Sequence, residues 1–158
     1  MKTLIRDCAI IIIAASALGV GWNIINPQGY SFTPKKSIRN DFLVDITEKE
    51  ARIKKDSGAA VFIDAREEPF HRALRIPGSI NIPAWPDATR NALIETFFDQ
   101  INAPRECVIY CSGNSCDASR TLAKSIIAMG YSRHIYILTG GIELWKNSGL
   151  PVEGESLK

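Results

Sequence analysis

The sequence has few of the residues that metal sites and disulfide frameworks need. It contains four cysteines and two histidines among 158 residues. The cysteines, Cys8, Cys107, Cys111 and Cys116, are not spaced as paired Cys-x-x-Cys ligands, and neither histidine stands close to them in the sequence. Four cysteines are also too few for a disulfide scaffold in a chain of this length. We therefore expect no bound metal ion and no other cofactor.

A strong excess of charge of either sign is also absent. Nineteen lysines and arginines stand against 17 acidic residues, which leaves a net charge of +2. No basic stripe with interleaved aromatic residues is present, so we do not expect nucleic acid as a partner. The chain shows no internal repeat and no low-complexity run. With 46% hydrophobic residues it can form one globular domain with an appendage.

The appendage is an uncharged apolar segment over residues 8–25. Its length is that of a membrane-spanning helix, which needs about 20 apolar residues, and Trp22 suits the membrane interface. The alternative is a cleaved signal peptide, whose apolar region would be shorter and would end at a small-x-small site before a polar mature start. We therefore predict an uncleaved, single-pass membrane anchor over residues 1–26, inserted through residues 8–25.

The charges beside the apolar segment predict its orientation. Lys2, Arg6 and the amino terminus precede it, and the positive-inside rule then leaves the N-terminal end in the cytoplasm. The folded domain would lie outside, which in a bacterium is the periplasm, although Lys35, Lys36 and Arg39 on the other side oppose this orientation. Residues 27–37, rich in proline and glycine, are predicted to be a linker. Residues 38–158 form the predicted domain.

Strand and helix patterns alternate along this domain. Thr47 and Glu50 form a predicted capping box that begins a helix ending near Ser57-Gly58, and residues 86–101 have helical spacing. The strands are predicted at Phe42–Val44, Val61–Ile63, Ser79–Ile82, Cys107–Tyr110 and Ile135–Leu138. The alternation predicts an α/β fold, with a mainly parallel five-stranded sheet and helices on both faces. Residues that directly follow strands, such as Asp64, Cys111 and Thr139, would then meet at one edge of the sheet.

The stretch from Cys107 to Lys124 has the arrangement that activates a thiol. An apolar strand stops at Cys111, four small or polar residues follow, and a helix begins after Cys116. Loop N–H groups and the positive end of the helix dipole would stabilise a thiolate there. We therefore predict Cys111 as a nucleophile. The predicted anion-cradling loop consists of Ser112, Gly113, Asn114 and Ser115.

Cys116 follows Cys111 by five residues and has two interpretations. It is a resolving thiol, which would attack a persulfide on Cys111 and leave a disulfide, or it is a small residue packed at the helix start. A disulfide requires the two Cα atoms to lie within about 7 Å, which the sequence does not establish.

Several sequence blocks together resemble a single-domain rhodanese. The resemblance covers about residues 40–154 and implies a sulfurtransferase that carries sulfane sulfur on Cys111 as a persulfide. It implies a donor such as thiosulfate or a persulfide, a thiophilic acceptor that can be a protein, and a site-organising role for Asp64 and Arg66. Gly140, Gly141 and Trp145 match a structural signature. The blocks are Val61–Arg66, Ile76–Pro83, Val108–Cys111, Gly130–Tyr131 and Leu138–Trp145.

The chain departs from the family pattern in two places. Leu74-Arg75 replace the Gly-His that commonly precedes Ile-Pro-Gly, and the loop after Cys111 is longer than in short single-domain rhodaneses. Longer-looped relatives include phosphatases, but these need the arginine of a Cys-x5-Arg signature, and Asp117 stands in that place. Because Asp117 would repel a phosphate dianion, we do not expect phosphatase activity.

The sequence leaves other assignments open. Any cationic help at the site would come from Arg66, Arg75 or Arg120, and the sequence does not distinguish them. We expect His71 to be a solvated surface residue. Two alternatives to the sulfurtransferase remain. One is a thiol–disulfide redox protein that uses Cys111 and Cys116, and the other is a non-catalytic rhodanese-fold binding module.

Overall fold

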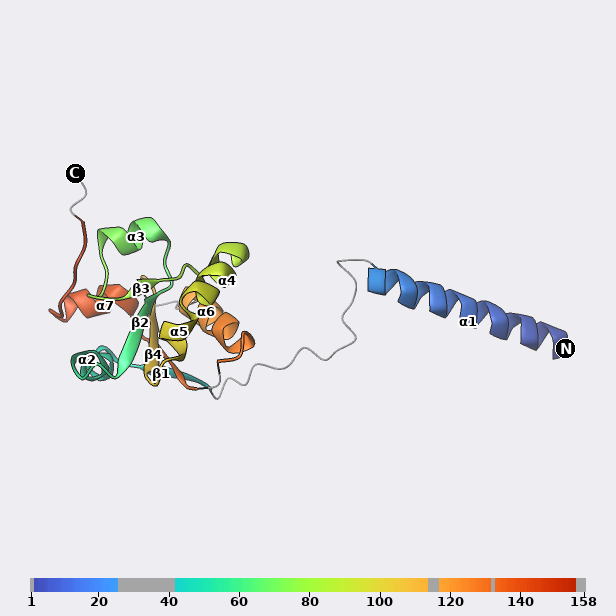
Figure 1. Ribbon diagram of the computed structural model, residues 1–158, viewed down its shortest axis with the longest axis horizontal. Helices are drawn as coiled ribbons and strands as arrows, with labels where there is room; N and C mark the ends of the chain where they lie inside the picture. The colour runs from blue at the N-terminus through green and yellow to red at the C-terminus, as the bar shows by residue number, and fades with distance from the viewer. Residues whose placement is uncertain (1, 26–41, 114–116, 132, 156–158) are drawn as a thin grey trace. The chain divides into compact units, whose positions relative to one another are not determined.

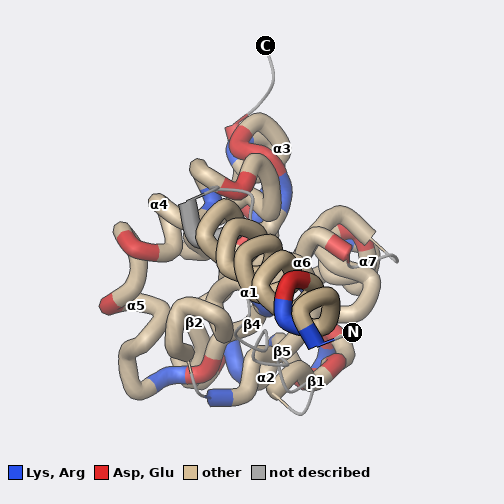
Figure 2. The backbone as a smooth tube through the Cα atoms, turned by 90° about the vertical axis from the view of Figure 1, so that its right-hand side faces the viewer, with Lys and Arg blue, Asp and Glu red and all other residues tan. Residues whose placement is uncertain are grey.

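The computed structural model describes residues 2–25, 42–113, 117–131 and 133–155. The chain divides into two units, Met1–Ser37 and Ile38–Lys158. In the first unit the described residues form one helix, α1, Lys2–Ile25. Its charged residues are confined to its first two turns (Figure 2). By length and composition, Lys2–Trp22 is apolar enough to cross a membrane, a test that an N-terminal signal sequence also passes.

In the described part of the second unit, five strands form one sheet in the order β1-β5-β4-β2-β3. Every pair of neighbouring strands is parallel, which confirms the predicted sheet. Most strands consist of β-branched and aromatic residues, which pack well on a sheet covered on both faces. Their bounds are β1 Leu43–Ile46, β2 Ala60–Asp64, β3 Ile80–Asn81, β4 Glu106–Tyr110 and β5 Ile135–Leu138.

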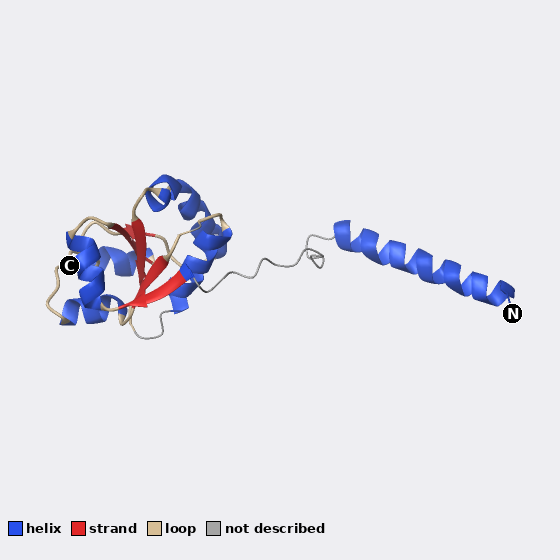
Figure 3. Cartoon of the chain, turned by 90° about the horizontal axis from the view of Figure 1, so that it is seen from below, coloured by secondary structure: helices blue, strands red, loops and turns tan. Residues whose placement is uncertain are grey.

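Helices cover both faces of the sheet, as predicted (Figures 1 and 3). Helices α2 and α7 lie on one face and α4, α5 and α6 on the other (Figure 1). The predicted capping box is confirmed: Thr47 accepts from the backbone of Glu50, whose carboxylate accepts from the backbone of Thr47 at 2.8 Å. The bounds are α2 Glu48–Asp56, α3 Glu68–Ala73, α4 Asp87–Thr96, α5 Phe98–Asn102, α6 Asp117–Ala128 and α7 Gly141–Asn147.

One predicted helix is two helices in the structure. The spacing over residues 86–101 predicts a single element, but the backbone leaves the helical conformation at Phe97, where φ is −97° and ψ is 10°. The apolar side chains on both sides of this break, Ile94 and Ile101, remain in the same buried cluster. The hydrophobic pattern continues through the break, so it gave no sign of it.

Strand β4 divides its side chains between two hydrophobic cores. Cys107, Ile109 and Cys111 belong to the core that packs under α4, α5 and α6. Val108 and Tyr110 belong to the core under α2 and α7. This alternation follows from the two-residue period of a strand. It directs the side chain of Cys111 toward the α4–α6 layer, and that of its neighbour Tyr110 toward the opposite layer.

Candidate functional site

The carboxyl ends of the strands bring the predicted site residues to one edge. Asp64 is in register with Tyr110, and the next residue, Ala65, donates its amide to the carbonyl of Tyr110 at 2.9 Å. Thr139 follows β5 and donates its amide to the carbonyl of Ile46, at the end of β1, at 3.0 Å. The prediction that Asp64, Cys111 and Thr139 share one sheet edge is therefore confirmed.

Cys111 is the first residue after β4, and it is only 6% exposed. Its thiol donates to the carbonyl oxygen of Gly113 at an S···O distance of 3.5 Å. Ala65 and Ile82 belong to the same buried cluster as its side chain. The sulfur is thus recessed beneath the start of its own loop.

The loop backbone is fastened by the first turn of α7. The amide of Ile142 donates to the carbonyl of Cys111 at 2.9 Å, and the amide of Glu143 donates to the carbonyl of Ser112 at 3.3 Å. Gly141 makes this approach possible, since a Cβ there would overlap the carbonyl oxygen of Cys111. Its φ of 54° also lies in the left-handed region that favours glycine. The Gly-Gly signature is therefore a requirement of close packing between α7 and the loop.

Trp145 holds α7 in place from the other side. Its side chain is 1% exposed and packs edge-on against Phe62, with ring centroids 5.9 Å apart. Its indole N–H donates to the carbonyl of Pro151 at 2.8 Å, so the polar end of the ring is also satisfied. Trp145, which matches the structural signature of the family, is therefore a core residue.

Asp64 is fully buried and bound by two basic side chains. Arg66 donates to its carboxylate through Nε at 2.9 Å and Nη2 at 2.6 Å, and its backbone amide adds a third bond at 3.0 Å. Burial acts to raise the pKa of Asp64, but the hydrogen bonds from His71 and Arg66 outweigh it and hold that pKa below its ordinary value. Arg66 also donates to the carbonyl of Leu74 at 2.5 Å, which ties β2 to the end of α3.

The expectation that His71 is a solvated surface residue is wrong. Its side chain is 14% exposed, and its Nδ1 lies 3.1 Å from Oδ2 of Asp64. Helix α3 folds over the end of β2 and turns His71 inward, whereas the adjacent Arg72 stays exposed and pairs with Glu68. The charged segment that contains α3 shows no hydrophobic periodicity, so the sequence did not indicate which face of this short helix would be buried.

The three arginines considered for the site are each bound to an acid. Arg66 pairs with Asp64, Arg75 with Glu153 at 2.8 Å, and Arg120 with both oxygens of Asp45 at 2.7 Å. No contact between described residues joins any of these arginines to Cys111. Their described roles are to connect segments of the fold.

Two acidic residues, Glu143 and Asp117, stand beside the loop. A Cβ on Gly113 would lie 3.2 Å from Oε2 of Glu143, so this carboxylate borders the loop backbone. Asp117 begins α6 just beyond the loop. The loop residues Asn114, Ser115 and Cys116 lie outside the described residues, so the predicted cradle is described only at Ser112 and Gly113. The proposed role of Cys116 likewise stays a prediction.

Two side chains that the sequence did not single out support the same edge. The hydroxyl of Tyr110 accepts from the amide of Ile76 at 3.1 Å and lies 2.8 Å from Oγ of Ser79, and burial raises its pKa. Asn81 donates its side-chain amide to the carbonyls of Asp64 at 3.1 Å and Arg66 at 2.8 Å. Both residues lie in blocks of the family resemblance, which was the available signal. They fix the backbone between β2 and β3.

Among the described side chains, no group of three or more histidine, cysteine, aspartate or glutamate residues is placed to hold a metal ion. Asp64 and His71 approach each other, but Arg66 occupies the remaining space on the carboxylate. The groups described at this edge are its thiol, the start of its loop backbone and the surrounding charged side chains.

Comparison with known proteins agrees with this arrangement. The family model described as "Rhodanese-like domain" matches residues 46–148. The HTH-type transcriptional regulator Rv0324 of Mycobacterium tuberculosis is 31% identical over 108 residues, which cover 68% of this chain and 44% of that protein. The chain thus matches less than half the length of this curated relative.

Solved structures share the fold. A protein from Bacillus halodurans superposes with a TM-score of 0.59 at 23% identity, over 70% of this chain and 77% of that one. Thiosulfate sulfurtransferase from Pseudomonas aeruginosa superposes with a TM-score of 0.56 at 20% identity, over 73% of this chain and 21% of that one. At these identities the likeness is one of architecture.

Proposed function

Because this chain belongs to the rhodanese-like family, we propose that it is a sulfurtransferase in which Cys111 carries sulfane sulfur as a persulfide. The observation that carries the proposal is the placement of Cys111. Its thiol stands at the carboxyl edge of a parallel sheet, directly after β4, and its loop backbone is fastened by α7. That edge is where open α/β sheets bind their ligands.

The transfer takes place in two displacements at sulfur. The Cys111 thiolate attacks the outer sulfur of the donor, a new S–S bond forms, and the donor's S–S bond breaks with its electron pair leaving on the donor fragment. Thiosulfate would leave as sulfite, and a persulfide donor would leave as a thiolate. An acceptor thiolate, on a small molecule or a protein, then attacks the outer sulfur of the Cys111 persulfide and regenerates the thiolate. No external oxidant or reductant is consumed.

The residues around Cys111 have separate roles in this proposal. The predicted cradle of Ser112, Gly113, Asn114 and Ser115 would supply backbone N–H groups to the thiolate and the anionic donor, because small residues permit a tight loop. In the described thiol form the carbonyl of Gly113 accepts from the sulfur, so this peptide would have to turn when the thiolate forms. The N-terminus of α6 adds its dipole to the stabilisation of the thiolate. Asp64 and Arg66 act at a distance, because their ion pair fixes the end of β2 beside the loop.

The charges near the loop favour donors of low charge. Glu143 borders Gly113, and Asp117 stands where phosphatases of this fold need arginine. A dianion would be repelled by both carboxylates, with no bidentate guanidinium to replace its water. We therefore propose that a persulfide is a better donor than thiosulfate, and that phosphate esters are not substrates.

The test is the mass of the intact protein after incubation with thiosulfate or a polysulfide, measured before and after reduction. A gain of one sulfur atom that is lost in Cys111→Ser supports the carrier. Cys8→Ser is the matched control, since it removes a thiol of α1 and should load normally. A loss of two hydrogens that requires both Cys111 and Cys116 would replace the proposal by the redox pair. If the mass is unchanged under every condition, the domain is a binding module.

We also propose that α1 is an uncleaved anchor and that the domain lies on the periplasmic side. The support is the length and apolar composition of α1 together with Lys2 and Arg6 before its apolar run. A reporter that is active only in the cytoplasm, fused after Lys158, should be silent. Membrane-bound protein should retain the mass of the whole chain; a shortened, soluble product would identify a signal peptide instead.

A further inference from the structure

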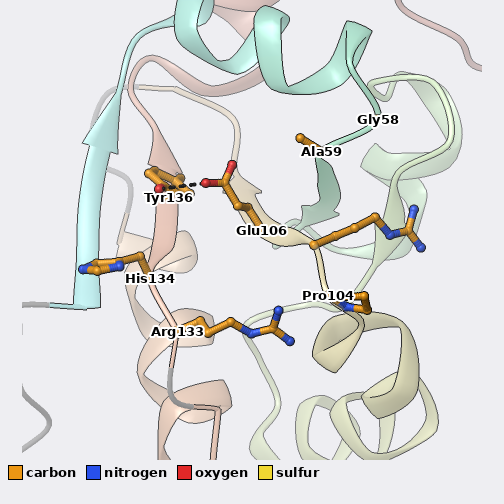
Figure 4. Close-up of a pocket in the computed structure, with 8 residues that line it drawn as sticks. Gly58, Ala59, Pro104, Glu106, Arg133, His134 and Tyr136 are labelled. Atoms are coloured by element: carbon orange, nitrogen blue, oxygen red, sulfur yellow. Dashed lines mark hydrogen bonds between the residues drawn. The ribbon is translucent and has the colours of Figure 1, made fainter.

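A cavity lies at the opposite edge of the sheet, at the amino ends of β2, β4 and β5 (Figure 4). Its volume is about 690 Å³, which is in the range of small-ligand pockets. Three loops that are distant in the sequence build it. Its lining residues are Gly58, Ala59, Pro104, Arg105, Glu106, Arg133, His134 and Tyr136.

Two arginines of this cavity have no acidic partner among the described residues. Arg133 donates through one nitrogen to the carbonyls of Asn102 at 2.5 Å and Ala103 at 2.7 Å, and its guanidinium lies 5.6 Å from the ring centre of Tyr131. These contacts hold it in place without neutralising it, and Figure 4 shows it extended toward Pro104. Arg105 is exposed, and no described side chain pairs with it.

Glu106, the acidic residue of the cavity, is already paired with Lys54 and not with either arginine. Glu106 accepts from Nζ of Lys54 at 2.6 Å. It also accepts from the hydroxyl of Tyr136 at 3.1 Å, the dashed line in Figure 4. The hydrogen bond from Lys54 lowers the pKa of Glu106, so its carboxylate is charged and compensated. The charges of Arg105 and Arg133 are therefore left over, and the cavity is positive.

The chain enters the domain at this same edge. Leu43, the first residue of β1, is in register with Ile135, the first residue of β5. Phe42 packs near His134, with ring centroids 6.1 Å apart. Residues 26–41, which connect this point to α1, can span at most about 55 Å. The segment that leads to α1 is therefore attached to the domain at the edge that carries the cavity.

We propose that this cavity binds the phosphate group of an anionic phospholipid in the membrane that holds α1. Arg105 offers the forked guanidinium donors that bind phosphate bidentately. Arg133, whose Nη2 is committed to the carbonyls of Asn102 and Ala103, adds its remaining N–H groups and its charge. The inference rests on the proposed anchor and is independent of the chemistry at Cys111.

The experiment compares the full chain in nanodiscs of phosphatidylcholine alone and of phosphatidylcholine with phosphatidylglycerol. Hydrogen–deuterium exchange is followed for residues 102–106 and 133–136, with residues 66–75 at the other edge as the internal reference. We expect exchange at the cavity to slow by at least about threefold with phosphatidylglycerol. Arg105→Gln should abolish the protection, and Lys146→Gln, which removes an exposed charge from α7, should not.

Three results would overturn the proposal. Equal exchange in the two nanodiscs would show that no anionic lipid is bound. Protection that persists in Arg105→Gln would show that the cavity is not the site. The same protection from inorganic phosphate in phosphatidylcholine nanodiscs would identify a soluble phosphate as the ligand. Because Cys111→Ser should behave as wild type here, failure of the lipid site is distinct from failure of the sulfurtransferase.

Discussion

The amide of Ile142 donates a 2.9 Å hydrogen bond to the carbonyl of Cys111. This bond joins the first turn of α7 to the residue that we propose as nucleophile. It places the backbone of α7 so close to the loop that position 141 must be glycine. The position of the sulfur therefore depends on a helix that contributes no reactive group of its own.

Substitution of Gly141 by alanine should displace the loop. The new Cβ would overlap the carbonyl of Cys111, and a positive φ strains any side chain, so we expect a loss of about 2–4 kcal/mol in unfolding free energy and of persulfide loading. Gly149→Ala is the matched control, because Gly149 has a φ of 71° with no atom within 4 Å of a Cβ. It should cost about 1 kcal/mol and load normally. Equal effects of the two variants on loading would contradict the packing argument.

Loss of His71 should destabilise the domain although its helix lies at the surface. His71→Ala removes a bond to a fully buried carboxylate, and we expect urea unfolding to show a loss of about 1–3 kcal/mol. Arg72→Ala, on the same helix and exposed, removes only a surface ion pair and should leave the urea unfolding curve nearly unchanged. A His71→Ala variant as stable as Arg72→Ala would show that the contact with Asp64 is dispensable.

The ion pair of Asp64 should make stability depend on acid pH. The pKa of Asp64 is lowered in the folded state, so its contribution is complete above the unfolded value of about 3.9 and is lost as pH falls through the lower folded value. In Asp64→Asn the fall in unfolding free energy below about pH 4 should be smaller. At pH 7 this variant should be about 3–5 kcal/mol less stable, because Arg66 is left buried without its partner. If the unfolding free energy falls equally below about pH 4 in Asp64→Asn and in the wild type, Asp64 is not the group responsible for the pH dependence.

Removal of the carboxylate beside Gly113 should help anionic donors. Glu143→Gln should raise the rate of loading by thiosulfate several-fold, roughly threefold to tenfold at low salt, and affect a neutral persulfide donor little. The gain should shrink as ionic strength rises, since exposed charges are screened. Glu68→Gln, on exposed α3, should change neither rate. A gain that is equal for both donors would point to altered loop packing instead of charge.

Most of the sheet was predictable because its signals are local. Strands β1, β2, β4 and β5 are marked by apolar runs, and the start of α2 by the spacing of Thr47 and Glu50. The two-residue strand β3 is marked by the Pro-Gly turn before it and by Pro83 after it. The shared edge of Asp64, Cys111 and Thr139 followed from the alternation of strands and helices. The break at Phe97 was not predictable, because the apolar side chains on either side of it, Ile94 and Ile101, keep a helical spacing and pack into the same core.

The side-chain contacts of the edge were less predictable. The approach of His71 to Asp64 depends on the rotation of a six-residue helix, which the sequence does not encode periodically. The cavity with Arg105 and Arg133 combines loops from three parts of the chain, whose meeting follows only from the strand order. The acidic partners of Arg75 and Arg120 are also distant in sequence. The sequence therefore could not show that these two arginines form ion pairs away from Cys111.

The length of β4 separates two regions of the domain. Glu106 begins this strand and Cys111 directly follows it, so about 17 Å of fully paired backbone lies between the cavity and the thiol. Parallel neighbours β2 and β5 bind β4 on both sides and prevent it from sliding. Substitutions at the two ends should therefore have additive effects. The connection to α1 or the lining of the cavity can therefore be changed by substitution without a change in the reactivity of Cys111.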